Sequence, residues 1–153
     1  MAIYYADTSV LAKRHLTEIG SAWVRALLTP RTGNLVITVQ LSLVELYSAF
    51  NRRVREHAIN PLRYRRIVAL SKRIWLSQYD IIGLSGALVN EACDLLERHP
   101  LRAYDAVQLA AALEARRTLQ AVGSAAPIFL SADNRLLLAA QAEGFVTDNP
   151  NSH

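Results

Sequence analysis

The segment IYYADTS, at residues 3–9, contains the strand-to-helix junction on which the predicted fold depends. Its first four residues are an apolar, β-prone run, typical of a short buried strand. The next three, Asp7, Thr8 and Ser9, are all good helix-capping residues. The segment therefore predicts a strand that passes directly into a helix, with an acidic side chain where the strand ends.

The same alternation of short strands and helices continues along the chain. Short apolar strands separated by helices are typical of a parallel sheet covered on both faces. We therefore expect one α/β domain over residues 1–148, with a polar tail at 149–153. Its mostly parallel sheet has about five short strands with helices on both faces and a protruding helical hairpin. Besides the first strand, strands are expected at 35–38, 80–82, 127–130 and 145–147. Helices are expected at 10–28 with a break near Gly20, and at 40–56, 61–79, 85–98, 103–117 and 134–144, the second and third forming the hairpin.

Length and composition agree with a single globular domain. The chain has 153 residues, of which 52% are hydrophobic and 20% charged, and this balance argues against disorder. No apolar run reaches the roughly 20 residues that a membrane helix needs, and no secretory pattern opens the chain, so we expect a cytoplasmic protein. The single cysteine, Cys93, excludes an internal disulfide and a multi-cysteine zinc site. Its apolar helical surroundings indicate a core residue and not a nucleophile.

Positive charge is concentrated in the hairpin. The whole chain has a net charge of +4, and 15 of its 17 basic residues are arginines. Eight basic and two acidic residues lie between Gln40 and Tyr79, a net charge of +6, so the rest of the chain carries −2. A localised basic stretch is typical of a surface that binds nucleic acid or an acidic protein. A merely solvated helix face remains the alternative.

Two acids lie where predicted strands end. Asp7 follows the first strand and Asp133 follows the strand at 127–130. Ligands of open parallel sheets bind beyond the carboxyl ends of the strands, so both acids are candidate site residues. Either residue taken alone is better explained as the cap of its helix.

A third candidate, Glu45, lies on the side of its helix opposite the apolar stripe of Leu43, Tyr47 and Phe50. The residues around it are mostly small, as expected for a carboxylate that faces a cleft. The alternative is that Ser42 and Glu45 form a capping box at the start of the helix.

The fourth candidate, Asp105, lies in the first turn of an alanine-rich helix that must be mostly buried. The helix dipole favours an acid there, but a buried carboxylate also needs a partner or a cation. Carboxylates gathered at one edge of a sheet repel one another unless a cation holds them, and a set of oxygen ligands suits Mg²⁺ or Mn²⁺. Such a pocket beside a basic hairpin predicts phosphodiester hydrolysis on nucleic acid. The histidines are scattered, which disfavours a ribonuclease with paired histidines, and the chain has no glycine-rich phosphate loop.

Four sequence blocks resemble the PIN-domain ribonucleases of the VapC toxin type, and they occur in that family's order. The blocks are YADTSVLAK at residues 5–13 with Glu18-x-Gly20 after it, LVEL at 43–46, LRAYDAVQLA at 101–110 and FLSADNRL at 129–136. Each block alone is weak, but four in order cover nearly the whole chain.

The resemblance implies an Mg²⁺- or Mn²⁺-dependent endoribonuclease that acts as the toxin of a toxin–antitoxin pair. The four acids would be its catalytic and metal-binding quartet, with Thr8 and Ser131 as auxiliary polar groups. A metal-activated water would attack an RNA phosphate and leave a 5′-phosphate and a 3′-hydroxyl. The resemblance also implies a homodimer and a complex, heterotetrameric or larger, with a cognate antitoxin.

Candidate RNA contacts are Arg52, Arg53 and Arg65 of the hairpin, and Arg102 beside the third block. The alternative function is a PIN-like module that binds RNA or protein without cleavage. Four mutually repelling acids favour the enzyme, because a pure binder has no use for them. The RNA target, the number of metal ions and the partner of the hairpin stay open.

Overall fold

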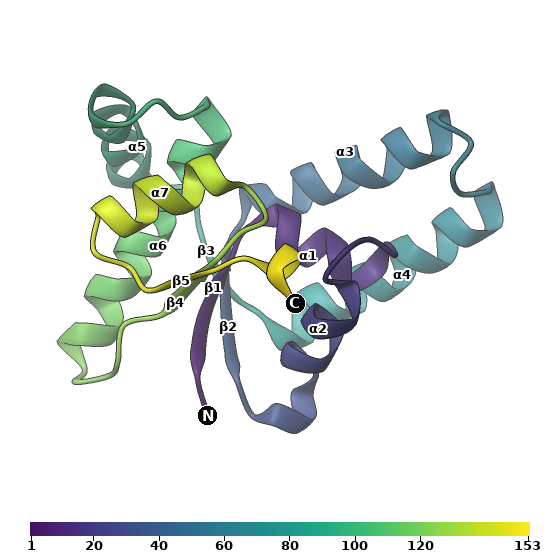
Figure 1. Cartoon of the computed structure of the whole chain (residues 1–153), viewed down its shortest axis with the longest axis horizontal. Helices are drawn as coiled ribbons and strands as arrows, with labels where there is room; N and C mark the ends of the chain where they lie inside the picture. Colours follow the sequence, from purple (N-terminus) through teal and green to yellow (C-terminus); the bar gives the residue numbers. More distant parts are fainter.

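The computed structural model describes all residues from 1 to 153 as one α/β domain built on a five-stranded parallel sheet (Figure 1). The strand order is β3-β2-β1-β4-β5, and every neighbouring pair is parallel. The sheet is therefore entirely parallel, and its first strand lies at the centre. The strands are β1 (Ile3–Ala6), β2 (Leu35–Val39), β3 (Asp80–Ile82), β4 (Ile128–Leu130) and β5 (Thr147–Asp148).

Seven α-helices and two short 3₁₀ helices surround the sheet. The second 3₁₀ helix, which lies in the C-terminal tail, packs on α2. None of the helices is both long and apolar enough to span a membrane. The helices are α1 (Thr8–His15), α2 (Ser21–Leu27), α3 (Leu41–Arg55), α4 (Pro61–Gln78), α5 (Gly86–Arg98), α6 (Ala103–Ala121), α7 (Asn134–Ala142), η1 (Pro30–Thr32) and η2 (Pro150–Ser152).

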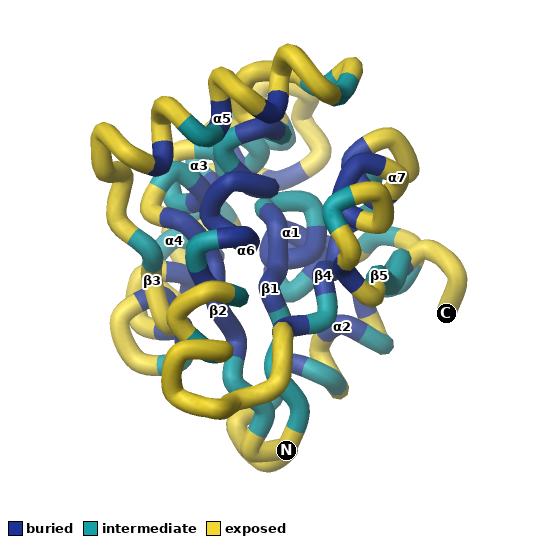
Figure 2. Tube along the Cα trace, turned by 90° about the vertical axis from the view of Figure 1, so that its left-hand side faces the viewer, coloured by how far each residue is buried: buried dark blue, intermediate teal, exposed yellow.

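Two hydrophobic cores lie on opposite faces of the sheet. Alternate residues of a strand point to opposite faces, so Tyr5 and Phe129 join the core under α5, α6 and α7. Their neighbours Ala6 and Leu130 join the core under α1, α2, α3 and α4. In Figure 1 the sheet lies between these two groups of helices, and in Figure 2 the residues of the central strands are mostly buried. The alanine-rich helix α6, predicted to be mostly buried, packs most of its alanines against the sheet and α5.

The hairpin of α3 and α4 projects from the body of the domain (Figure 1). Its inner face is anchored by Phe50 and Ile67, which are buried in the second core. Asn60 caps α4 by accepting a hydrogen bond from the backbone N–H of Arg63 at 2.8 Å. The basic side chains of α4 are therefore carried outward on a helix whose other side is apolar.

Three sequence expectations were wrong in detail. The α6 helix runs to Ala121, four residues past the expected end, because no residue after Arg117 breaks it before Gly123. The last strand is Thr147–Asp148, because Phe145 packs into the core against Phe129, 5.7 Å between ring centroids. Cys93 is exposed, because α5 buries only the stripe of Leu88, Ala92 and Leu95.

Candidate functional site

The site lies at the carboxyl ends of the central strands, where the order of the sheet reverses. The chain proceeds from β1 to β2 on one side and places β4 on the other, so the loops after β1 and β4 leave a crevice between them. Asp7 directly follows β1, and Asp133 follows β4 by three residues. Glu45 comes from the second turn of α3, and Asp105 from the first turn of α6.

Asp7 is buried and held by three donors. Its Oδ1 accepts hydrogen bonds from the Ser9 hydroxyl at 2.6 Å and the Val10 N–H at 3.2 Å, and its Oδ2 accepts from the Ser131 hydroxyl at 2.8 Å. Burial raises the pKa of Asp7 from 3.8 to about 6; the three hydrogen bonds oppose this shift, and the nearby charge of Glu45 adds to it. Asp7 therefore caps α1 and also interacts with the charge of a second candidate acid, Glu45.

Glu45 is fixed by polar groups and does not belong to a capping box. Its Oε1 accepts hydrogen bonds from the Thr8 hydroxyl at 2.8 Å and the Gln108 amide at 2.9 Å. The capping-box alternative for Ser42 is wrong, because α3 already begins at Leu41 and the buried Ser42 hydroxyl contacts other side chains. Glu45 is thereby directed toward α1 and α6 and away from its own helix end.

Asp105 and Asp133 lie near enough to each other for their charges to interact. Partial burial raises the pKa of Asp105, the charges of Asp133 and then Glu45 raise it further, and Arg102 opposes the shift. Asp133 caps α7, since its Oδ1 accepts from the Arg135 N–H at 2.8 Å. The four acids therefore form a series of interacting charges, from Asp7 to Glu45 to Asp105 to Asp133.

The donor chemistry of this series suits a hard divalent cation, since every candidate ligand is an oxygen. The repulsion that raises the pKa of Asp105 is what a bound cation would relieve. In this conformation, however, the chain has no group of three histidine, cysteine or acidic side chains arranged to hold an ion.

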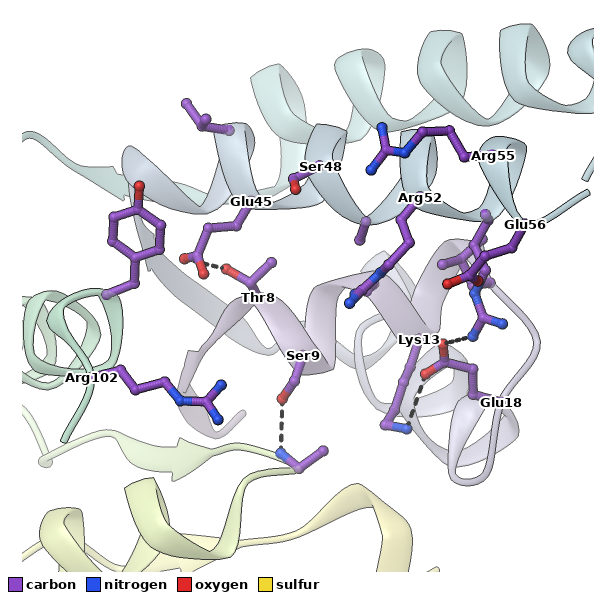
Figure 3. Close-up of a pocket in the computed structure, with 17 residues that line it drawn as sticks. Thr8, Ser9, Lys13, Glu18, Glu45, Ser48, Arg52, Arg55, Glu56 and Arg102 are labelled. Atoms are coloured by element: carbon purple, nitrogen blue, oxygen red, sulfur yellow. Dashed lines mark hydrogen bonds and ion pairs between the residues drawn. The ribbon is translucent and has the colours of Figure 1, made fainter. Parts of the chain in front are cut away.

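A cleft of about 980 Å³ opens beside the acids, between α1, α3 and the start of α6 (Figure 3). Glu45, Thr8 and Ser9 line its inner end. The other three acids do not line it, but their chain neighbours do. The cationic lining residues are Lys13, Arg52, Arg53, Arg55 and Arg102, and the acidic ones are Glu18, Glu45 and Glu56.

The candidate RNA contacts differ in their position. Arg52, Arg53 and Arg102 line the cleft, whereas Arg65 lies on the exposed surface of α4 and is not part of it. Arg53 is paired with Glu18, which also accepts from the buried Lys13 at 3.3 Å. Arg52 and Arg102 form no ion pair or side-chain hydrogen bond within the chain, so their guanidinium groups are free to bind an anion.

Sequence reasoning missed two polar residues of this site. Ser9 was interpreted only as a capping residue, yet it joins Asp7 to the Ala132 N–H, which donates to it at 2.8 Å. Gln108 was passed over, although it is an uncharged polar residue among the alanines and leucines of α6, three residues after Asp105. A lone amide on a helix face that is otherwise apolar was the available signal.

Comparison with known proteins agrees with this geometry. Residues 4–141 match the family model of the PIN domain. The chain is 30% identical over 148 residues to ribonuclease VapC47 of Mycobacterium tuberculosis (strain CDC 1551 / Oshkosh), an alignment that covers 95% of this chain and 96% of that protein. The chain therefore belongs to the PIN-domain family and, within it, to the VapC group.

Solved structures show the same fold. The chain superposes on Mycobacterium tuberculosis VapC20, described as a sarcin-ricin loop cleaving toxin, with a TM-score of 0.62 at 20% identity, covering 95% of this chain and 97% of that one. It also superposes on a toxin–antitoxin complex from Klebsiella pneumoniae with a TM-score of 0.54 at 16% identity, covering 96% and 97%. The predicted PIN-like α/β fold is thereby confirmed.

Proposed function

We propose that this chain is a divalent-metal-dependent endoribonuclease that serves as the toxin of a toxin–antitoxin pair in the cytoplasm. The observation that carries the proposal is the series of four interacting carboxylates at the switch point of the sheet, beside a cleft lined with arginines. Membership of the VapC group supports the activity, since the relative VapC47 is a ribonuclease and VapC20 a toxin that cleaves the sarcin-ricin loop.

Asp7, Glu45, Asp105 and Asp133 would together hold Mg²⁺ or Mn²⁺. When bound, such an ion supplies an activated water nucleophile and positive charge opposite the phosphate oxygens. Hydrolysis would leave a 5′-phosphate and a 3′-hydroxyl. The partial burial of these acids supports the assignment, because a charged carboxylate out of water needs a compensating cation.

The chain's own polar groups set the direction of these carboxylates. Ser9 and Ser131 hold the two oxygens of Asp7, and Thr8 holds one oxygen of Glu45. A carboxylate fixed in this way loses little freedom when it takes its place around a cation or substrate. Thr8 and Ser131 thus act as orienting groups, in the auxiliary role that the family resemblance implies.

Arg52, Arg55 and Arg102 would bind the RNA backbone. All three line the cleft and none is engaged by an acid of the chain. The planar guanidinium group matches the geometry of a phosphate, so these arginines can hold the strand next to the carboxylates. The binding energy would then position the scissile phosphate at the acidic end of the cleft.

A cognate antitoxin and a second copy of the chain are the proposed protein partners. The structural neighbour from Klebsiella pneumoniae is a toxin–antitoxin complex, which supports the first. An inhibitor of such an enzyme must cover the cleft or contribute groups that pair with its free arginines. The homodimer rests on the resemblance to the VapC group.

The decisive experiment is an RNA cleavage assay of the purified chain in Mn²⁺, in EDTA, and with the near-isosteric variant Asp105→Asn. We expect cleavage with 5′-phosphate ends in Mn²⁺ only, and a loss of at least about 100-fold in the variant, the size typical for a removed catalytic group. Cleavage undiminished by EDTA would exclude the metal mechanism. RNA binding without cleavage in Mn²⁺ would favour the non-cleaving module instead.

A further inference from the structure

A buried polar network behind the carboxylates is centred on Gln108. This side chain is 2% exposed, and its amide oxygen accepts a hydrogen bond from the Tyr5 hydroxyl at 2.8 Å. Its amide nitrogen lies 2.9 Å from Glu45 Oε1, 2.9 Å from the Ser42 hydroxyl and 3.1 Å from the Thr8 hydroxyl. One side chain of α6 therefore connects β1, α1 and α3 at the point where the site is built.

The amide of Gln108 can adopt only one of its two orientations. Turned by 180°, it would place its oxygen against the carboxylate oxygen of Glu45, acceptor against acceptor. The Tyr5 hydroxyl donates from the opposite side and holds the observed orientation. Burial, followed by the charges of Asp7 and Glu45, raises the pKa of Tyr5 well above its usual value, so this donor keeps its proton.

The hydroxyl groups behind the amide can be assigned as donors or acceptors in turn. Thr38 donates to the Ala6 carbonyl at 2.9 Å. The bond of 2.9 Å between Thr38 and Ser42 must then have Ser42 as donor. Ser42 is left with a lone pair for the Gln108 amide, and both hydroxyls are fully buried. The donor and the acceptor of each of these hydrogen bonds are therefore fixed.

This series of hydrogen bonds ends at the carboxylate of Glu45. The Gln108 amide has two hydrogens; Ser42 takes one, and Glu45 Oε1 shares the other with the adjacent Thr8 hydroxyl. Thr8 in turn donates its own hydrogen to the same Oε1. Oε1 is thus held by two donors, whereas Oε2 makes no hydrogen bond within the chain and Glu45 lines the cleft.

We propose that Gln108 is a positioning residue that turns Oε1 of Glu45 inward and presents Oε2 to the cleft as the oxygen that faces the metal ion. The proposal rests on the function proposed above for the site. Gln108 itself is too deeply buried to touch RNA. Its effect is to fix one ligand of a divalent cation through a hydrogen bond, and thereby to set how well that ligand binds.

The test titrates Mn²⁺ into Gln108→Met and into the parent, each as the full chain without RNA. Electron paramagnetic resonance measures the binding. Methionine preserves the length of the side chain and removes both donors. We expect about 10-fold weaker Mn²⁺ binding, the lower end of the range for partners of metal ligands. In the RNA assay kcat should fall while KM stays within about twofold, because Gln108 makes no contact with the substrate.

Leu113→Ala is the matched control. Leu113 lies on the same helix and is buried in the core away from the acids, so this variant loses stability without touching Glu45. Its Mn²⁺ affinity should equal that of the parent. If Gln108→Met binds Mn²⁺ as tightly as Leu113→Ala does, the amide is only a packing element and the proposal is wrong.

Tyr5→Phe provides a second variant should Gln108→Met fail to fold. It leaves the amide donors in place but removes the bond that fixes their direction, so we expect a loss of Mn²⁺ affinity of about threefold, smaller than the loss when the donors themselves are removed. Unchanged affinity in a folded Tyr5→Phe would likewise contradict the positioning role. A parent that binds no Mn²⁺ at all would instead overturn the function proposed for the site, and the positioning role with it.

Discussion

At the scale of single residues, capping a helix and belonging to the site are not competing roles. Asp7 caps α1 with one oxygen and receives Ser131 with the other. Asp133 caps α7 and still raises the pKa of Asp105 through its charge. A carboxylate has two oxygens, so sequence reasoning that weighed a cap against a ligand was choosing between two uses that one side chain can combine.

The raised pKa of Asp105 leads to a stability prediction. An acid whose pKa is higher in the folded than in the unfolded chain costs stability once the pH exceeds its unfolded value of about 4. Asp105→Asn removes this charge with little change in shape. In EDTA at pH 7.5 the variant should therefore melt a few degrees higher than the parent, measured by circular dichroism.

In Mg²⁺ the difference between Asp105→Asn and the parent should narrow or reverse, because the parent gains binding free energy that the variant loses. If Asp105 serves only the dipole of α6, asparagine should instead cost a few tenths of a kcal/mol up to about 1 kcal/mol in both buffers. Equal destabilisation in EDTA and in Mg²⁺ would thus make Asp105 a structural acid.

The shifted pKa values of His15 and Asp7 change the stability of the fold in opposite directions as the pH falls. Burial, helped by Arg14 and Arg25, lowers the pKa of His15 from 6.5 to about 4, and its Nδ1 has no hydrogen-bond partner. As the pH falls, His15 is protonated in the unfolded chain before it is protonated in the folded one. The stability due to neutral His15 is therefore complete above pH 6.5 and is lost as the pH falls to 4. Asp7, with its pKa raised to about 6, opposes this trend over the same range.

Replacing His15 by leucine should remove the acid-sensitive contribution. The free energy of unfolding of the parent, relative to His15→Leu, should fall as the pH is lowered from 7 to 4, and the accumulated change approaches about 3 kcal/mol. Urea unfolding curves at several pH values measure it. Parallel pH profiles for the two chains would mean that folding does not lower the pKa of His15.

At the scale of elements, sequence patterns located helices and strands because their ends carry local signals. Ser85, Asn60 and Asp133 each cap the helix that their chemistry predicts. The last strand was misplaced because Phe145 is as compatible with a strand as with a buried loop, and only packing on Phe129 decides between them. Boundaries determined by tertiary contacts cannot be obtained from local pattern.

The two helices of the hairpin should differ in their effect on RNA binding. Arg52 of α3 lines the cleft, whereas Arg65 of α4 does not. Arg52→Glu should weaken RNA binding and reduce the slope of log affinity against log salt by about 1, because each lost phosphate contact retains its counterion. Arg65→Glu has the same charge change and should affect both much less.

Fluorescence anisotropy with a labelled RNA, at several salt concentrations in EDTA, separates these effects from cleavage. An unchanged salt slope for Arg52→Glu would show that the cleft does not carry the RNA backbone. Equal losses for both variants would indicate a response to net charge alone, as the long-range field of a basic protein produces.

At the scale of the whole molecule, the sequence blocks identified the acids but could not predict the network between them. Three of the acids follow strands or open helices, positions that a parallel topology brings to one edge. Gln108 was not predictable as a partner of Glu45, because Gln108 lies 103, 66 and 63 residues from Tyr5, Ser42 and Glu45. Contacts of this range depend on the register of the packed elements.

The C-terminal tail closes the molecule against its N-terminal half. Pro150 is buried beside Gly20, and the ring of His153 stacks on Trp23 with 4.1 Å between centroids. Gly20 has φ +78°, and a Cβ there would lie 2.1 Å from the Pro150 carbonyl oxygen. Gly20 is therefore required both by its left-handed backbone and by the close approach of the tail.

Gly33 separates these two requirements, since it has φ +68° but nothing within 4 Å of its Cβ position. Gly33→Ala should cost roughly 1–2 kcal/mol, the strain of the left-handed backbone alone. Gly20→Ala should cost about 1–3 kcal/mol more, because the tail must move. In a chain that ends at Asp148, the cost of Gly20→Ala should fall to that of Gly33→Ala. Urea unfolding of four chains, the full-length and the shortened protein each with and without Gly20→Ala, measures this. A cost that is independent of the tail would mean that the tail does not press on Gly20 in solution, since the backbone strain would then account for the whole effect.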